Sequence, residues 1–299
     1  MAEDETCSSY SVGFDEDPGG TASRHRGWLL IEQPGAWGRN ALLESKLPAE
    51  VAEAVDGRRR DAGVRVLLIR RGPGPSSSDR RRWAFARTTA TDPVVGGGWF
   101  RDPAELLALD LAGMASGEVP VPDAGSGPLV AVCTHGRHDR CCADNGRPVA
   151  RHLRQAGVDV WECSHVGGDR FAANVVSFPH GLYHGRVTPA TALALVHAYG
   201  EGRIHPAGFR GRAAWSPAAQ QAEILLRHEL DEWGVEALEL DGHDHDGDRH
   251  TVRFSVAGQV HEVVVDVSIA DHERLLACQN TALGRPRVIT PVSIRSLGD

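Results

Sequence analysis

Three of the chain's six cysteines lie in the stretch CTHGRHDRCCADNG, residues 133–146, among histidines and arginines. About twenty residues downstream, the stretch ECSHVGGDR adds Cys163, His165 and Asp169. Thiolate and imidazole ligands suit zinc or an iron–sulfur cluster, whereas calcium and magnesium prefer oxygen ligands. Together the two stretches indicate a metal centre.

The spacing of the first two candidate ligands favours a large metal group. Eight residues separate Cys133 from Cys142, more than the two to four between the cysteines of structural zinc sites. A loop that wraps around a two-iron cluster, with two ligands on each iron, explains this spacing better. The adjacent Gly167 and Gly168 would let the main chain approach the cluster sulfides and donate N–H groups to them.

The elements that must position these residues follow an α/β pattern. Apolar and β-branched runs predict strands at 27–33, 64–71, 82–88 and 158–165, and a strand that runs into a loop over 128–136. Apolar periodicity, capping residues and prolines in first turns predict helices at 47–63, 102–117, 146–157, 188–202 and 216–234. A strand–helix–strand order implies parallel strands, whose carboxyl ends meet at one edge of a sheet. We therefore expect the loop containing Cys133 and Cys142 to meet the loop that follows Cys163.

The two halves of the chain have the same element order, and both have an Ala-Gly-Val turn into the second strand, at 62–64 and 156–158. This match predicts an internal duplication, unless it is only the general likeness of βαβ units. The predicted fold is α/β, with two thioredoxin-like domains in tandem, the second carrying the cluster. The predicted organisation is a loosely ordered segment at 1–24, thioredoxin-like domains at 25–118 and 128–215, and a C-terminal helix and β-hairpin region at 216–299.

The residues CTHGRHDRCC, GRPVA and SHVGGDRFAANVVSFPHGLYHGRVTP resemble the sucrase/ferredoxin-like family, a branch of thioredoxin-like [2Fe-2S] ferredoxins, most strongly over 128–190. The family pattern has two cysteines in the first loop and His-x-Gly-Gly-His in the second. The resemblance implies Cys133, Cys142 and His165 as cluster ligands. Asp169 stands where the family has its second histidine, so either Asp169 or Cys163 would complete the site. Thiolate is the commoner cluster ligand, which favours Cys163.

The remaining cysteines and nearby histidines have simpler interpretations. We expect Cys141 to be a buried neighbour of the site, and Cys7 and Cys278 to be without a ligand role. His135 and His138 are expected to be solvated loop residues, unless they lie near the cluster and couple protonation to electron transfer.

One acidic stretch outside this region, DGHDHDGDRH at 241–250, resembles a calcium loop only in composition, because it lacks the closing glutamate. It is expected to be an acidic loop before a β-hairpin at 250–269, which alternates apolar and polar residues around Ala257-Gly258.

Composition restricts the possible functions. A net charge of −8 argues against nucleic acid as a partner, and no apolar run is long enough for a membrane span. The N-terminal residues lack the apolar segment of a signal peptide, so we expect a cytoplasmic protein with reduced thiols. No hydrolase or nucleotide-binding motif appears, so an electron carrier is expected in place of an enzyme.

The leading hypothesis is a [2Fe-2S] electron-transfer protein that exchanges electrons with a redox partner protein, with possible proton coupling at a histidine ligand. A zinc-stabilised binding module is the alternative, with Cys133, Cys142, Cys163 and His165 in a closed tetrahedral site. A thiol redox enzyme is the weakest of the three, because the Cys-x-x-Cys motif is absent.

Overall fold

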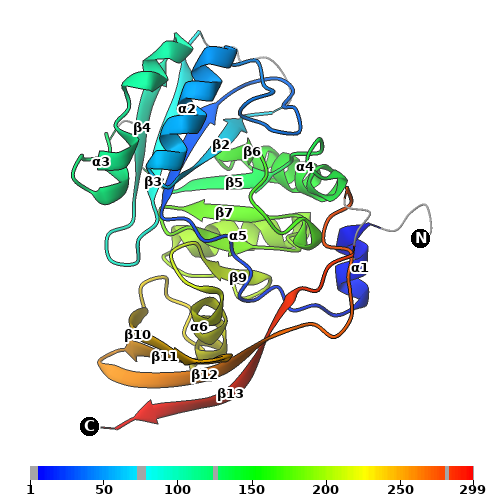
Figure 1. Cartoon of the computed structure of the whole chain (residues 1–299), viewed down its shortest axis with the longest axis vertical. Helices are drawn as coiled ribbons and strands as arrows, with labels where there is room; N and C mark the ends of the chain where they lie inside the picture. The colour runs from blue at the N-terminus through cyan, green and yellow to red at the C-terminus, as the bar shows by residue number, and fades with distance from the viewer. Residues whose placement is uncertain (1–5, 73–78, 124–126, 280–282, 299) are drawn as a thin grey trace.

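The computed structural model describes residues 6–72, 79–123, 127–279 and 283–298. It is a mixed α/β structure with one large mixed sheet and a separate antiparallel sheet (Figure 1). The predicted α/β class is confirmed. Residues 1–5 of the predicted N-terminal segment and 124–126 of the predicted linker lie outside the described residues. No described helix is long and apolar enough to cross a bilayer.

The large sheet has nine strands in the order β4-β3-β1-β2-β6-β5-β7-β8-β9. Their bounds are β1 (Gly27–Glu32), β2 (Val64–Arg70), β3 (Arg81–Arg87), β4 (Val94–Phe100), β5 (Leu129–Cys133), β6 (Val160–Cys163), β7 (Val175–Phe178), β8 (Leu182–His184) and β9 (Phe209–Arg212). Helices α1 (Cys7–Gly13), α2 (Ala49–Asp61), α3 (Leu111–Ser116), α4 (Arg140–Gln155), α5 (Pro189–Gly200) and α6 (Pro217–Leu230) accompany them, with 3-10 helices η1 (Pro103–Ala108) and η2 (Asp169–Phe171).

Both predicted βαβ units are present and parallel: β1 with β2, connected through α2, and β5 with β6, connected through α4. In each half a third strand pairs antiparallel with the first, and a fourth pairs antiparallel with the third. The halves join where β2 and β6 pair antiparallel, at Ile69 with Cys163 and Arg70 with Glu162. Strands of both predicted domains thus form one continuous sheet, and the tandem thioredoxin-like assignment stays a prediction.

One predicted helix is divided. The segment expected to be a single helix at 102–117 forms η1 and α3, because Leu109 between them has an extended backbone. The side chain of Asp110 accepts a hydrogen bond from the N–H of Gly113 and starts the second helix afresh. Thr188 and Ser216 cap α5 and α6 in the same way, at the positions predicted for their starts.

The C-terminal sheet has four antiparallel strands in chain order: β10 (Leu238–Asp246), β11 (Arg249–Val256), β12 (Gln259–Ile269) and β13 (Arg287–Leu297). The predicted hairpin around Ala257-Gly258 is confirmed, since Val256 pairs with Gln259. The prediction of an acidic loop at 241–250 is wrong. Its residues form β10, a turn with Gly247 at positive φ, and the start of β11. Helix α6 packs its apolar face on this sheet (Figure 1).

Residues Cys7–Gly13, within the segment predicted to be loosely ordered, form helix α1 with Cys7 and Ser11 buried. Thr6 caps this helix, and Glu16 beyond it pairs with Arg170, at 2.9 Å. The helix lies beside the N-terminal end of α4 and the chain segment that leads from β12 to β13 (Figure 1).

Candidate metal centre

Two cysteines of the predicted site flank the connection from β5 to α4. Cys133 is the last residue of β5, and Cys142 lies in the first turn of α4. The prediction that Cys142 lies in a loop is wrong, because the Asp139 side chain accepts a hydrogen bond from the N–H of Cys141 and starts the helix at Arg140. The helix therefore points Cys142 back toward the end of β5.

The structure brings four of the predicted site residues together. The sulfurs of Cys133 and Cys142 and a ring nitrogen of His165 all lie within 4.8 Å of one another. Asp169 joins them, because its Oδ1 is 3.1 Å from the Cys142 sulfur and 2.9 Å from Nδ1 of His165. His138 also lies at this site, with its ring stacked on His165 at 3.7 Å between centroids. Cys133, Cys142 and Asp169 are buried.

Cys163, which the sequence favoured over Asp169 as the fourth ligand, lies apart from this group. It ends β6 beside Cys133 and is fully buried in the same apolar cluster. Within the described ranges, its sulfur belongs to no group of three donor atoms within 4.8 Å of one another. Burial raises the pKa of the Cys163 thiol, as expected of a packed thiol.

His135 is a positioning residue of this site. It is only 3% exposed, so the prediction that it is a solvated loop residue is wrong. Its Nε2 lies 2.7 Å from the Gly38 carbonyl, and its Nδ1 accepts a hydrogen bond from the N–H of His165. The segment around Gly38, which follows β1 in the first half, thereby fixes the main chain at His165.

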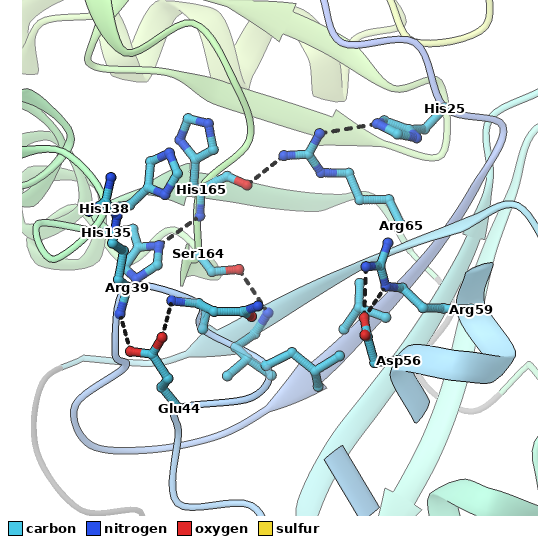
Figure 2. Close-up of a pocket in the computed structure, with 15 residues that line it drawn as sticks. His25, Arg39, Glu44, Asp56, Arg59, Arg65, His135, His138, Ser164 and His165 are labelled. Atoms are coloured by element: carbon cyan, nitrogen blue, oxygen red, sulfur yellow. Dashed lines mark hydrogen bonds and ion pairs between the residues drawn. The ribbon is translucent and has the colours of Figure 1, made fainter. Parts of the chain in front are cut away.

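The site opens on a cavity of about 520 Å³ between the two halves. Its wall includes Arg39, Arg59, Arg65, His138 and His165 (Figure 2). Arg65 donates a hydrogen bond to the carbonyl of His165 at 2.7 Å. Glu44 and Asp56 also line the cavity, and Asp56 pairs with Arg59, so the two histidines face a wall of both arginines and carboxylates.

One of the comparisons with known proteins found a match that covers this region. The family model described as sucrase/ferredoxin-like matches residues 18–211, which include the whole candidate site. The chain belongs to the sucrase/ferredoxin-like family. No curated protein and no solved structure matches it significantly.

The donor atoms of this sucrase/ferredoxin-like protein fit a metal group. Nδ1 of His165 is buried and lies 2.9 Å from Oδ1 of Asp169, which pairs with it when the imidazole is protonated. Two thiols and an imidazole, with a carboxylate beside them, are a donor set for iron or zinc.

The electrostatics make a thiolate available, while the imidazole has to release a proton before it can bind a cation, because its pKa is raised. A hydrogen bond from the Cys142 thiol lowers the pKa of Cys133 well below its usual range, and raises that of Cys142. Burial alone would lower the pKa of His165, but the nearby Asp169 carboxylate and Cys133 sulfur outweigh it and raise the pKa to about 9. The pair of cysteines therefore shares one proton, and a thiolate is available to a cation.

Gly167 and Gly168 form the turn between His165 and Asp169, both at positive φ. A Cβ on Gly167 would lie 2.3 Å from Oγ of Ser23, and one on Gly168 would lie 2.3 Å from Nη2 of Arg210. Backbone conformation and close packing therefore require glycine here. Donation of their N–H groups to a cluster stays a prediction.

Sequence reasoning missed Arg210, which holds this turn from behind. The side chain is almost fully buried and donates hydrogen bonds to the carbonyl of Gly167 at 3.1 Å, to Oδ1 of Asn174 at 2.6 Å and to the carbonyl of Thr21 at 2.6 Å. Burial lowers the pKa of this guanidinium to about 10. The only indication in the sequence that Arg210 is buried was its position directly after an apolar residue in the short run FRGR.

A second missed residue, Glu162, joins the two halves beside the site. Its buried carboxylate accepts hydrogen bonds from Arg70 of β2 at 3.1 Å, from Thr134 after β5 at 3.0 Å, and from Arg154 of α4 at 3.1 Å. A glutamate between Trp161 and Cys163 in a predicted buried strand could have indicated that it has hydrogen-bonding partners, because buried charges are paired.

Proposed function

We propose that this protein is an electron-transfer protein that holds one [2Fe-2S] cluster through Cys133, Cys142, His165 and Asp169. The observation that carries the proposal is that two thiols and an imidazole lie within 4.8 Å of one another, with the Asp169 carboxylate against Cys142 and His165. A cluster bound there would supply one-electron exchange at a potential set by its ligands and surroundings. The second βαβ unit is the thioredoxin-like ferredoxin domain in this proposal.

The four proposed ligands come from two sides of the site, one buried and one facing the cavity. Cys133 and Cys142 come from the end of β5 and the start of α4, where apolar side chains exclude water. His165 and Asp169 come from the turn after β6, and His165 faces the cavity. This division suits a mixed-ligand cluster whose cysteine side is buried and whose histidine side is near solvent.

Three arginines on the cavity wall favour a negatively charged group of a redox partner protein, although Glu44 and Asp56 offset part of their charge. Arg39, Arg59 and Arg65 line the approach to His165 (Figure 2). Opposite charges accelerate encounter and orient the partner. We place the protein in the cytoplasm in this proposal, because the reduced thiols that hold a cluster persist there.

The experiment is a visible absorption spectrum of protein purified without air, with iron, sulfide and zinc assayed on the same sample. A red-brown sample with about two irons and two sulfides per chain supports the proposal. A Cys133→Ser variant serves as the matched control and should be colourless. Wild-type protein that is colourless after growth in ample iron, with zinc that Cys133→Ser removes, would replace electron transfer by a zinc-stabilised binding module.

A further inference from the structure

A second group of cysteines lies next to the candidate centre, on the other side of the start of α4. The Cys141 sulfur lies 3.5 Å from that of Cys7 and 3.2 Å from that of Cys278, and the sulfurs of Cys7 and Cys278 are 3.4 Å apart. Cys7 begins α1, Cys141 lies in the first turn of α4, and Cys278 lies in the connection from β12 to β13. Three distant segments thus meet at three thiols.

Asp139 completes this group. Its side chain is fully buried. Oδ1 accepts a hydrogen bond from the N–H of Cys141 at 2.8 Å, and Oδ2 accepts one from the N–H of Cys278 at 2.6 Å. The Cys7 sulfur lies 3.8 Å from Oδ1. One carboxylate therefore fixes the main chain of two of the cysteines and contacts the side chain of the third.

Further donors point at the sulfurs. The hydroxyl of Ser8 donates to the Cys141 sulfur at 3.2 Å, and the N–H of Cys7 donates to the Cys278 sulfur at 3.3 Å. Hydrogen bonds from hydroxyl and main-chain N–H groups to sulfur are typical of thiolates that hold a metal.

A disulfide does not account for this arrangement. A disulfide joins two sulfurs at about 2.0 Å and would leave the third thiol unpartnered. Sulfurs bound to one tetrahedral zinc ion at about 2.3 Å would be about 3.8 Å apart, which is near the spacing observed here. Three cysteines and a carboxylate are four ligands, the number that a structural zinc site uses.

We propose that Cys7, Cys141 and Cys278, with the Asp139 carboxylate as fourth ligand, bind one Zn²⁺ ion. Each thiol releases its proton to solvent on binding. The site is separate from the candidate cluster centre, because the Cys142 sulfur contacts Asp169 while that of its neighbour Cys141 contacts Cys7 and Cys278. Its role is to tie α1 and the β12–β13 connection to the start of α4.

The test is zinc analysis of the full-length protein and its variants, purified without chelator. We expect about one zinc ion per chain in the wild type, and about none in Cys278→Ser and Cys7→Ser. Cys133→Ser is the control that separates this site from the cluster centre, and it should keep its zinc. Cys163→Ala, at a buried cysteine outside both groups, should keep it too. Zinc that survives Cys278→Ser, or that is lost with Cys133→Ser, overturns the proposal.

A measurement on wild-type protein covers the case in which the variants fail to fold. Thiol alkylation is followed residue by residue by mass spectrometry, with and without a strong zinc chelator. Cys7, Cys141 and Cys278 should be protected together and become reactive together when zinc is removed, and added Zn²⁺ should restore protection. Equal reactivity with and without the chelator, or a disulfide between two of the three, overturns the proposal.

Discussion

The two halves of the large sheet share a topology, but within the described residues only the second gathers candidate metal ligands. Glu32 and Ile69 form the last parallel pair of β1 and β2, and Cys133 and Cys163 form the last parallel pair of β5 and β6. Glu32 thus occupies the position of Cys133, and it accepts a hydrogen bond from the N–H of Arg82. The same strand end holds a sheet contact in one half and a candidate ligand in the other.

The connections that follow these strand ends differ even more. In the second half, 134–139 leads at once into α4, which places Cys142 beside Cys133. In the first half, 33–48 is longer and crosses to the second half, where the Gly38 carbonyl contacts His135. The first half therefore forms one wall of the site. The same strand topology occurs in both halves, so topology alone does not create a metal centre.

The largest expected effect comes from substituting Cys133, compared with the equivalent residue of the first half, Glu32. Cys133→Ser should lower the iron content per chain by about tenfold or more, because a hydroxyl is a poor substitute for a thiolate ligand. Glu32→Gln, the matched change in the first half, should leave iron content and visible absorbance unchanged. Iron assay and absorption spectra of both variants check this. Equal loss in the two variants would contradict the distinction between the halves.

Asp169→Ala and Cys163→Ala determine the fourth ligand. Asp169→Ala should lower the cluster content severalfold and shorten the lifetime of the visible absorbance in air, because the second-half turn loses a ligand. Cys163→Ala should keep the cluster and lower the free energy of unfolding by about 1–2 kcal/mol through the cavity it leaves. A colourless Cys163→Ala variant beside a coloured Asp169→Ala variant would restore Cys163 as the ligand.

Arg210→Met tests how the second half holds its turn. The change leaves buried acceptors on Gly167, Asn174 and Thr21 without their donor, so we expect the free energy of unfolding to fall by about 3–4 kcal/mol in urea titrations. Arg101→Met is the control, since Arg101 pairs with Asp79 on the exposed surface of the first half. This variant should change the free energy of unfolding by less than about 0.5 kcal/mol.

Acid sensitivity should reside mainly in the second half, because the first predicted domain, 25–118, contains one histidine, His25. Burial lowers the pKa of His184 from 6.5 to about 4, so at intermediate pH only the unfolded chain binds the proton. Stability is therefore lost as pH falls from about 6.5 to about 4, by up to about 3 kcal/mol. His184→Gln should flatten this part of the profile in denaturation experiments at several pH values. An unchanged slope would exclude His184 as the cause.

The smallest effect is expected where the first half contacts the site. His135→Phe keeps an aromatic ring but removes the hydrogen bonds with the Gly38 carbonyl and the His165 N–H. We expect the free energy of unfolding to fall by about 1–2 kcal/mol and amide hydrogen exchange in residues 34–47 to become faster, while the iron content is preserved. Exchange that stays slow there would show that other contacts hold this segment.

The sequence predicted the parts of the site that follow from strand order. Parallel strands end at one edge of a sheet, and this rule brought Cys133 and His165 together. The choice between Cys163 and Asp169 did not follow from the same rule. It depends on the turn at Gly167–Gly168, whose path is set by packing against Ser23 and Arg210.

The second cysteine group could not be predicted from spacing. Cys7 and Cys278 lie outside both βαβ units, and no local pattern relates either residue to Cys141. Only the three-dimensional path of α1 and of the β12–β13 connection brings them to Asp139. A cap residue usually bonds to the first turn of its own helix, and the sequence gives no indication that Asp139 also binds the N–H of Cys278.

The position of Asp139 also has a consequence for the order of folding. Its two carboxylate oxygens join residues that are two and 139 positions away, and Cys7 and Cys278, which both contact it, are 271 positions apart. Contacts that close long stretches of chain have a high entropic cost and form slowly. The βαβ units, made of nearer contacts, are therefore expected to form first. The protein should then pass through an intermediate stage in which Cys133 and Cys142 are already adjacent, while Cys7 and Cys278 are still exposed to the solvent.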